Sequence, residues 1–192
     1  MPSDPQNILS PATFLNRQAL YLRPDPARVV VRPFKPATEP RDLNPTDKTR
    51  ANRIVEGVLA LDAATVAAQL HDVLENFQGR HRNLLAKFEA RANDMEAALE
   101  PHQRFTLEQR RLVGAYFMHE YSFEAAALFN PSIVPHPDQS LAPPGGRRFI
   151  LSLRAVGEGH VSSLTFRSGS IAADGNVCID PTARLASVPA VH

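Results

Sequence analysis

The sequence has little cysteine, little net charge and no long apolar run, and each shortage excludes a class of protein. The single cysteine, Cys178, excludes an internal disulfide and any metal cluster built from several cysteines. This usage fits a reducing compartment, so we expect a cytoplasmic protein. Because 21 basic residues balance 20 acidic ones, giving a formal net charge of +1, nothing electrostatic favours nucleic acid or an anionic membrane as a partner.

Targeting and membrane signals are also missing. The first ten residues contain Pro2, Asp4 and Pro5, where a signal peptide needs basic residues followed by an apolar run. No window approaches the roughly 20 apolar residues of a membrane span. The chain has 43% hydrophobic and 21% charged residues, which is the composition of a folded protein with one or two small cores.

Proline is absent from one long region, and this gap outlines a helical module. Most of the 17 prolines lie in residues 1–45 and 131–144, and none lies between Thr46 and Glu100. Apolar residues at helical spacing predict four helices within residues 45–118. The residues expected on the inner faces are, for the first helix, Ala51, Ile54, Val55, Val58 and Leu59; for the second, Val66, Leu70, Val73, Leu74 and Phe77; for the third, Leu84, Leu85, Phe88, Met95 and Leu99; and for the fourth, Leu112, Val113, Tyr116 and Phe117.

Capping residues delimit three of these helices. Asn44-Pro45 supplies an N-cap and a proline at the first helical position for the first helix. Asp62 is expected to cap the second helix, which Gly79 ends. The fourth begins with Thr106-Leu107-Glu108-Gln109, the Thr-x-x-Gln form of a capping box.

Short strands are expected on both sides of the helical module. In the otherwise irregular arm over residues 1–44, the β-branched run from Arg28 to Arg32 predicts one strand at a sheet edge, closed by Pro33. After Asn130 the pattern has period two, since Phe149, Leu151 and Leu153 alternate with Ile150, Ser152 and Arg154.

This second set of strands predicts a three-stranded antiparallel meander. Leu164 and Phe166 continue the alternation after the Gly157-Glu158-Gly159 turn, and residues 176–180 follow the Asp174-Gly175 turn as a third strand. The roughly sixty residues after Asn130 are too few to close a barrel or a propeller. We therefore expect an incomplete β domain.

Generic catalytic and metal motifs are absent. Gly157-Glu158-Gly159-His160 lacks the third glycine of a dinucleotide-binding loop, and there is no Gly-Lys-Ser/Thr phosphate loop. His119, His136 and His160 have no short fixed spacing, so surface or hydrogen-bonded histidines are favoured over a zinc site.

Two segments carry a more specific signal. They are HEYSFEAAALFNPSIVPHPDQ, from His119 to Gln139, and FILSLRAVGEGHVSS, from Phe149 to Ser163. They resemble glycoside hydrolase family 130, specifically its longer, glycosidase-related members, and the helical module is similar to the N-terminal extension of those members. That family comprises five-bladed β-propellers that cleave β-mannosidic bonds with phosphate or with water.

The resemblance implies an α+β chain with an N-terminal helical module followed by the first antiparallel blade of an incomplete five-bladed β-propeller. Residues 1–44 would then be the arm, 45–128 the helical extension and 129–192 the start of the propeller. The whole enzyme would bind a manno-oligosaccharide or another β-mannoside. It would need no cofactor, with inorganic phosphate as co-substrate if it is a phosphorylase, and the helical extension is a candidate surface for homo-oligomer formation.

The resemblance also implies that Asn130, Ser132, Arg154 and His160 contact the sugar. An amide, a hydroxyl and a planar guanidinium suit sugar hydroxyl or phosphate oxygens. Three of them also have a structural interpretation: Asn130 as a turn residue before proline, Arg154 as a solvated strand-end cation, and His160, like Glu158, as part of a hairpin turn. Ser162 and Ser163 are equally well explained as cross-strand hydrogen-bond partners.

A catalytic acid is not recognised in this chain. Glycoside cleavage needs a carboxylic acid to protonate the leaving oxygen, and in the family it lies in a Glu-Asp-Pro/Ala-Arg motif. Ile179-Asp180-Pro181-Thr182 lacks the flanking glutamate and arginine, so no catalytic role is assigned to Asp180. We expect an N-terminal fragment that is inactive alone. The alternatives are a self-contained helical interaction protein with a small β-meander, and carbohydrate binding without catalysis.

Overall fold

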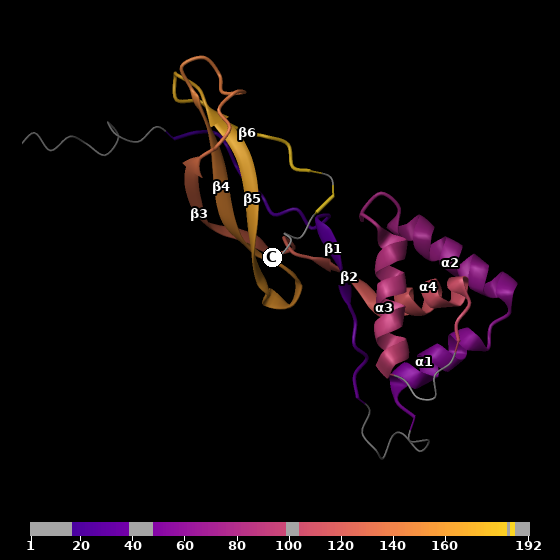
Figure 1. The fold of residues 1–192 in the computed structure, drawn as a ribbon. Coiled ribbons are helices and arrows are strands. Elements are labelled where there is room, and N and C mark those ends of the chain that lie inside the picture. The colour runs from indigo at the N-terminus through magenta and orange to yellow at the C-terminus, as the bar shows by residue number, and fades with distance from the viewer. Residues whose placement is uncertain (1–16, 39–47, 99–103, 184, 187–192) are drawn as a thin grey trace, which may run out of the picture.

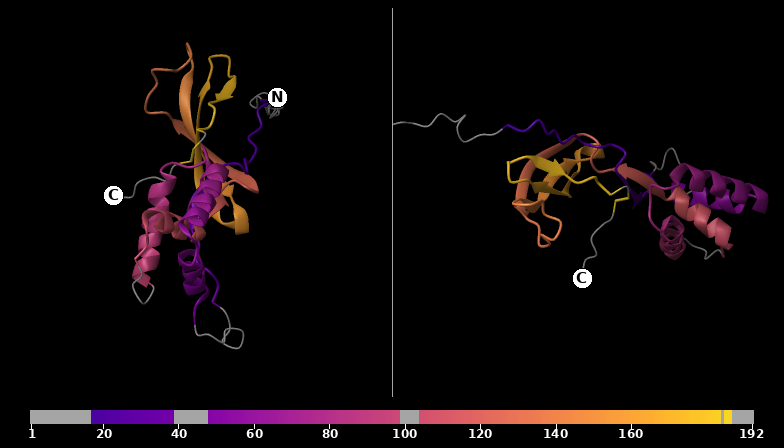
Figure 2. Two further views of the ribbon diagram at one scale, coloured as in Figure 1. Left: turned by 90° about the vertical axis from the view of Figure 1, so that its right-hand side faces the viewer. Right: turned by 90° about the horizontal axis from the view of Figure 1, so that it is seen from above.

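A computed structural model describes residues 17–38, 48–98, 104–183 and 185–186, and in these the chain is an α+β protein with four helices and two antiparallel sheets. Helices lie at one end of the molecule and the larger sheet at the other, with a two-stranded ribbon between them (Figures 1 and 2). The helices are α1 (Arg50–Leu59), α2 (Ala63–Phe77), α3 (Leu84–Ala98) and α4 (Leu107–Tyr116).

Two of the predicted helix caps are confirmed. Asp62 accepts hydrogen bonds from the backbone N–H and the hydroxyl of Thr65, both at 2.8 Å, and these bonds hold the pKa of its carboxyl below the usual value. Thr106 and Gln109 form the reciprocal capping box of α4. The predicted cap at Asn44-Pro45 lies outside the described residues, and Thr49 caps α1 by accepting from the Asn52 N–H.

The four helices enclose a core that follows the predicted stripes. Its buried members are Val55, Val58, Val66, Ala92, Met95, Leu112, Val113 and Phe117. Helices α3 and α4 approach closely at Gly114, where an added Cβ would collide with the carbonyl group of Phe88. The prediction that Tyr116 belongs to the core is wrong: this residue is at the last position of α4 and is 47% exposed. Leu99, another residue predicted to be in the core, lies outside the described residues.

No single helix in the described part of the chain is long and apolar enough to cross a membrane. Helices α1 and α2 meet that requirement only as a pair, which is bent by 117° at the break between them.

The predicted N-terminal strand is confirmed as β1 (Val29–Pro33), but its partner was not predicted. This partner is β2 (Met118–Ser122), antiparallel to β1 with Val29 opposite Ser122 and Pro33 opposite Met118. Residues 118–122 follow directly on α4 and lie within residues 45–128, where the sequence predicts a helical extension. The Arg91 guanidinium joins the ribbon to α3 by donating to the carbonyl oxygens of Phe117 and Phe34, at 3.2 and 3.0 Å.

The larger sheet has four strands, not the three that the sequence predicted. In chain order they are β3 (Ala127–Pro135), β4 (Arg147–Val156), β5 (Ser162–Ile171) and β6 (Val177–Ile179), each antiparallel to its neighbour, with the 3₁₀ turn η3 (Glu158–His160) between β4 and β5. The missed strand is β3. It contains Asn130-Pro131 and ends at Pro135, and these residues are typical of turns and irregular segments.

Candidate functional site

A β-bulge lies at the first predicted site residue. Phe129 is opposite Arg154 and Ser132 is opposite Ser152, so two residues of β3, Asn130 and Pro131, face a single residue of β4. Asn130 has a φ of 50°, in the left-handed region that asparagine tolerates better than most residues. The bulge also accommodates Pro131, which has no N–H to donate to the ladder. The local sequence thus positions Asn130 on an exposed edge strand.

Arg154 lies on β4 beside this bulge. Its side chain is exposed, and its Nε donates to the Ser162 hydroxyl of β5 at 3.0 Å. Within the described part of the chain no carboxylate forms an ion pair with it, so the terminal nitrogens of the guanidinium remain available to oxygen atoms of a ligand. Ser162, for which the sequence left two interpretations, is therefore a cross-strand partner of Arg154.

His160 lies in the turn that joins β4 to β5. It is exposed with a φ of 60°, next to Gly159 at 62°. The turn is held from outside the sheet, because the Tyr121 hydroxyl of β2 donates to the Val161 carbonyl oxygen at 3.4 Å. A Cβ on Gly157 would collide with that same hydroxyl. Strand β2 thus fixes the position of the turn that carries His160.

Asn130, Arg154 and His160 lie toward one end of the sheet, whereas Ser132 lies nearer its middle. Ser132 and Arg154 share a face, because Ser132 is opposite Ser152 and Ser152 is two residues before Arg154 on β4. The bulge places Asn130 between them along β3. Strand β4 ends at Val156, which is two residues, or about 7 Å along the strand, from Arg154. His160 lies in the turn that follows.

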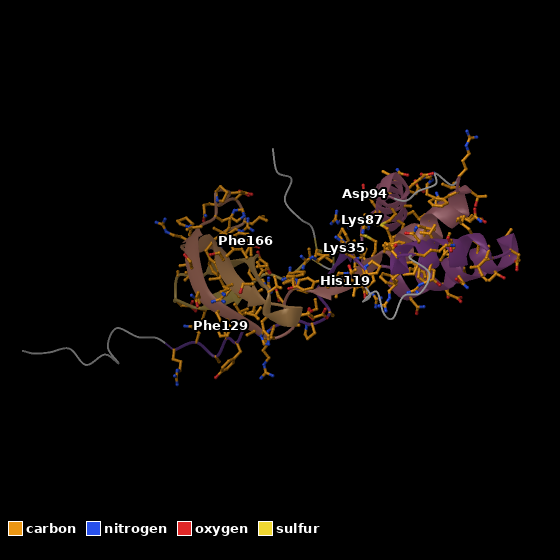
Figure 3. All side chains as sticks on the ribbon, turned by 90° about the horizontal axis from the view of Figure 1, so that it is seen from below. Lys35, Lys87, Asp94, His119, Phe129 and Phe166 are labelled. Atoms are coloured by element: carbon orange, nitrogen blue, oxygen red, sulfur yellow. The ribbon has the colours of Figure 1, made fainter. Side chains whose placement is uncertain are left out.

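The face that carries Arg154 also carries several exposed apolar side chains among its polar residues. Phe129, Leu164 and Phe166 lie on it with exposed fractions of 48%, 71% and 58%. Figure 3 shows Phe129 and Phe166 on the sheet, away from Lys87 and Asp94 on the helices. Val134 and Ile150 extend the same face along β3 and β4. We call this set of residues the open sheet face.

Asp180 lies apart from this group. It accepts a hydrogen bond from the Ser168 hydroxyl at 2.6 Å and lies 3.6 Å from the Arg148 guanidinium. Ser168 is four residues along β5 from Leu164, the residue opposite Arg154, which corresponds to about 13 Å. Asp180 thus forms an ion pair with Arg148 at the other end of the sheet.

A buried charge cluster was missed by the sequence interpretation. Glu124 has no exposed surface, and both of its carboxylate oxygens accept from Nη2 of Arg167 at 2.7 Å. The Arg28 guanidinium, from the segment before β1, also donates to Glu124, and the Thr165 hydroxyl donates to it at 2.9 Å. Burial lowers the pKa of Arg28, and Glu124 partly offsets this shift. Neighbouring residues of a strand point to opposite faces, so the period-two pattern around Phe166 is the sequence signal that could have placed Arg167 on the inner face.

In the described segments, no group of three or more histidine, cysteine, aspartate or glutamate side chains is arranged to hold a metal ion. Comparison of the chain with protein-family models, curated proteins and solved structures gives no match.

Proposed function

We propose that this chain is the N-terminal part of an enzyme similar to glycoside hydrolase family 130, which cleaves β-mannosidic bonds by phosphorolysis or hydrolysis. In this proposal Asn130, Ser132, Arg154 and His160 contact the mannoside, and the catalytic acid comes from a part of the enzyme beyond this chain. Inorganic phosphate is the co-substrate if the reaction is phosphorolysis.

The observation that carries the proposal is the geometry of the larger sheet. A propeller blade is a four-stranded antiparallel sheet. The order β3-β4-β5-β6 of the larger sheet is compatible with such a blade and supports the proposal. The first strand, β3, is exposed along most of its length and carries two of the four proposed sugar contacts. Its prolines discourage another strand from pairing with this edge, which leaves the edge accessible to a ligand.

The open sheet face gives independent support. Several large apolar side chains that are exposed on one face of a sheet favour a surface that another element or a ligand covers. Neighbouring blades of a propeller pack face to face, so such a surface is expected on a single blade.

The test is an NMR titration of the 192-residue chain with β-1,4-mannobiose. We expect weak saturable binding, with shifts concentrated at the amide and side-chain signals of Asn130, Ser132, Arg154 and His160. Arg154→Ala should abolish these shifts. Arg147→Ala should keep them, because Arg147 is an exposed arginine at the opposite end of the same strand.

Two results would count against the proposal. One is a set of shifts that maps to the helices or to the β6 end of the sheet. The other is an equal response to mannobiose and cellobiose, which differ at the 2-hydroxyl that a mannoside site has to recognise.

A second candidate function is binding of a partner or ligand by the helical module. It is favoured by an apolar groove between α2 and α4.

A further inference from the structure

An apolar groove of about 270 Å³ lies on the helical module, away from the open sheet face. Helices α2 and α4 form its sides, and these two helices contact each other in the fold (Figure 1). Phe88 and Leu112, each 1% exposed, form its floor. Val73 and Phe77 of α2, together with Tyr116, form its walls.

The groove exists because the apolar stripe of α2 is longer than the surface available to bury it. Val66 and Leu70, in the first half of the helix, are buried. Val73 and Phe77 continue the stripe at positions i+3 and i+7 from Leu70, but they are only half-buried and are not part of the buried core cluster. The second half of α2 thus presents apolar surface that the described residues do not cover.

One side of the groove is already organised by a hydrogen bond. The Tyr116 hydroxyl donates to the Gln69 side-chain oxygen at 3.2 Å, which joins α4 to α2 across the groove. This bond fixes the position of the half-exposed Tyr116 ring at one side of the groove. The other aromatic wall, Phe77, has the Arg80 guanidinium 5.5 Å from its ring centroid, and Glu120 holds that guanidinium at 2.9 Å.

The groove has a single charged residue among those that line it, and this residue is acidic. Asp72 is exposed at the rim, and its carboxylate has no hydrogen-bond or ion-pair partner among the residues that the structure describes. An unpaired carboxylate beside apolar and aromatic walls attracts a molecule that combines an apolar body with a positive charge.

We infer that this groove is a binding site for a small aromatic amine, with the ring between Tyr116 and Phe77 and the ammonium group at Asp72. The volume corresponds to about nine water molecules, so it holds a ligand of roughly ten to fifteen non-hydrogen atoms. This assignment makes the second candidate function specific, and it is independent of the proposed mannoside site because it uses none of the residues of the larger sheet.

Three indoles of nearly equal size test the charge preference directly: tryptamine is cationic, tryptophol is neutral and indole-3-acetate is anionic. The chain contains no tryptophan, so indole fluorescence reports the ligand with little protein background. We expect tryptamine to bind more tightly than tryptophol by about two- to fivefold, the effect of one exposed ion pair, and indole-3-acetate to bind least.

Asp72→Asn should remove the advantage of tryptamine and leave its affinity equal to that of tryptophol. The matched control is Glu75→Gln, which removes a neighbouring acid of the same helix that does not line the groove. That variant should keep most of the advantage. Tyr116→Ala should weaken all three indoles together, because it removes an aromatic wall and no charge.

Ala115→Phe should block binding by filling the groove. Circular dichroism establishes whether this variant is folded, and Tyr116→Ala, at an exposed position, takes its place if it is not. The inference is overturned if native protein binds the three indoles equally or not at all. It is also overturned if Asp72→Asn and Glu75→Gln reduce tryptamine binding to the same extent.

Discussion

At the residue scale, the Glu124 carboxylate links the segment before β1 to β5, because it accepts hydrogen bonds from Arg28, Thr165 and Arg167. It is fully buried and compensates two arginines, so the cluster carries an excess positive charge even when complete. A buried carboxylate in this position cannot be removed without leaving two guanidinium groups uncompensated. Arg28 differs, because the Glu124–Arg167 pair remains complete without it.

Glu124→Gln should therefore lower the free energy of unfolding by about 3–5 kcal/mol, the usual cost of breaking a buried ion pair from one side. Arg28→Met should cost less than about 2 kcal/mol, because it removes the excess charge while keeping the side-chain volume. Urea unfolding followed by circular dichroism measures both values. Equal losses in the two variants would mean that Arg28, and not Arg167, is the main partner of Glu124.

At the scale of the element, α3 and α4 pack closely because residue 114 is a glycine, which has no side chain to separate the two helices. Gly114→Ala should lower the free energy of unfolding by about 2–3 kcal/mol, because the new methyl group meets the Phe88 carbonyl and the helices have to separate. Gly57→Ala is the matched control, since it lies in α1 with open space around it. There alanine should stabilise by about 0.5–1 kcal/mol.

Thermal unfolding of the two alanine variants gives the comparison. If Gly114→Ala were as stable as Gly57→Ala, the close approach of α3 and α4 would not be a feature of the protein in solution.

Elements with strong local signals were predictable from the sequence. The four helices follow their apolar stripes, and the Asp62 and Thr106 caps lie where their side chains predict. Strand β2 was not predictable because its partner β1 lies far earlier in the chain, on the other side of the four helices. Strand β3 was not predictable because it contains Asn130-Pro131 and ends at Pro135, residues typical of turns. In β3, the local preference of Asn130-Pro131 for a turn is overridden by the ladder on either side of the bulge.

The candidate site shows the same limit. Period-two alternation could place Arg154 and Ser152 on one face of a strand. The bond from Arg154 to Ser162 depends on the register between β4 and β5, which the Gly157–Val161 turn sets. The Glu124 cluster joins three segments, since Glu124 is 96 residues from Arg28 and 43 residues from Arg167, and no local pattern predicts such contacts.

At the scale of the whole molecule, two separate groups of buried residues are joined by a narrow ribbon. The helical core ends at Phe117, whereas Phe149, Leu153 and Ala155 belong to the sheet and are not part of that core. The β1–β2 ribbon connects the two, with Arg91 and Tyr121 as its hydrogen-bonded links to either side.

Calorimetry should therefore show two unfolding transitions. We expect Gly114→Ala to lower the helical transition and Glu124→Gln the sheet transition, each by about 4–8 °C per kcal/mol for units of this size. A single transition that both variants lower equally would show that the ribbon couples the helices and the sheet into one cooperative unit.

The bulge at Asn130 has a further consequence, for how this strand can change in evolution. Before the bulge the odd-numbered residue Phe129 lies on the face that the even-numbered residues Ser132 and Val134 occupy after it. Deleting Asn130 would place Phe129 two positions before Ser132, so regular alternation without a bulge would keep both side chains on the same side of the sheet. A deletion elsewhere in β3 would instead move every side chain on one side of the deletion to the opposite face, so the bulge is a point at which this strand can change length without exchanging its faces.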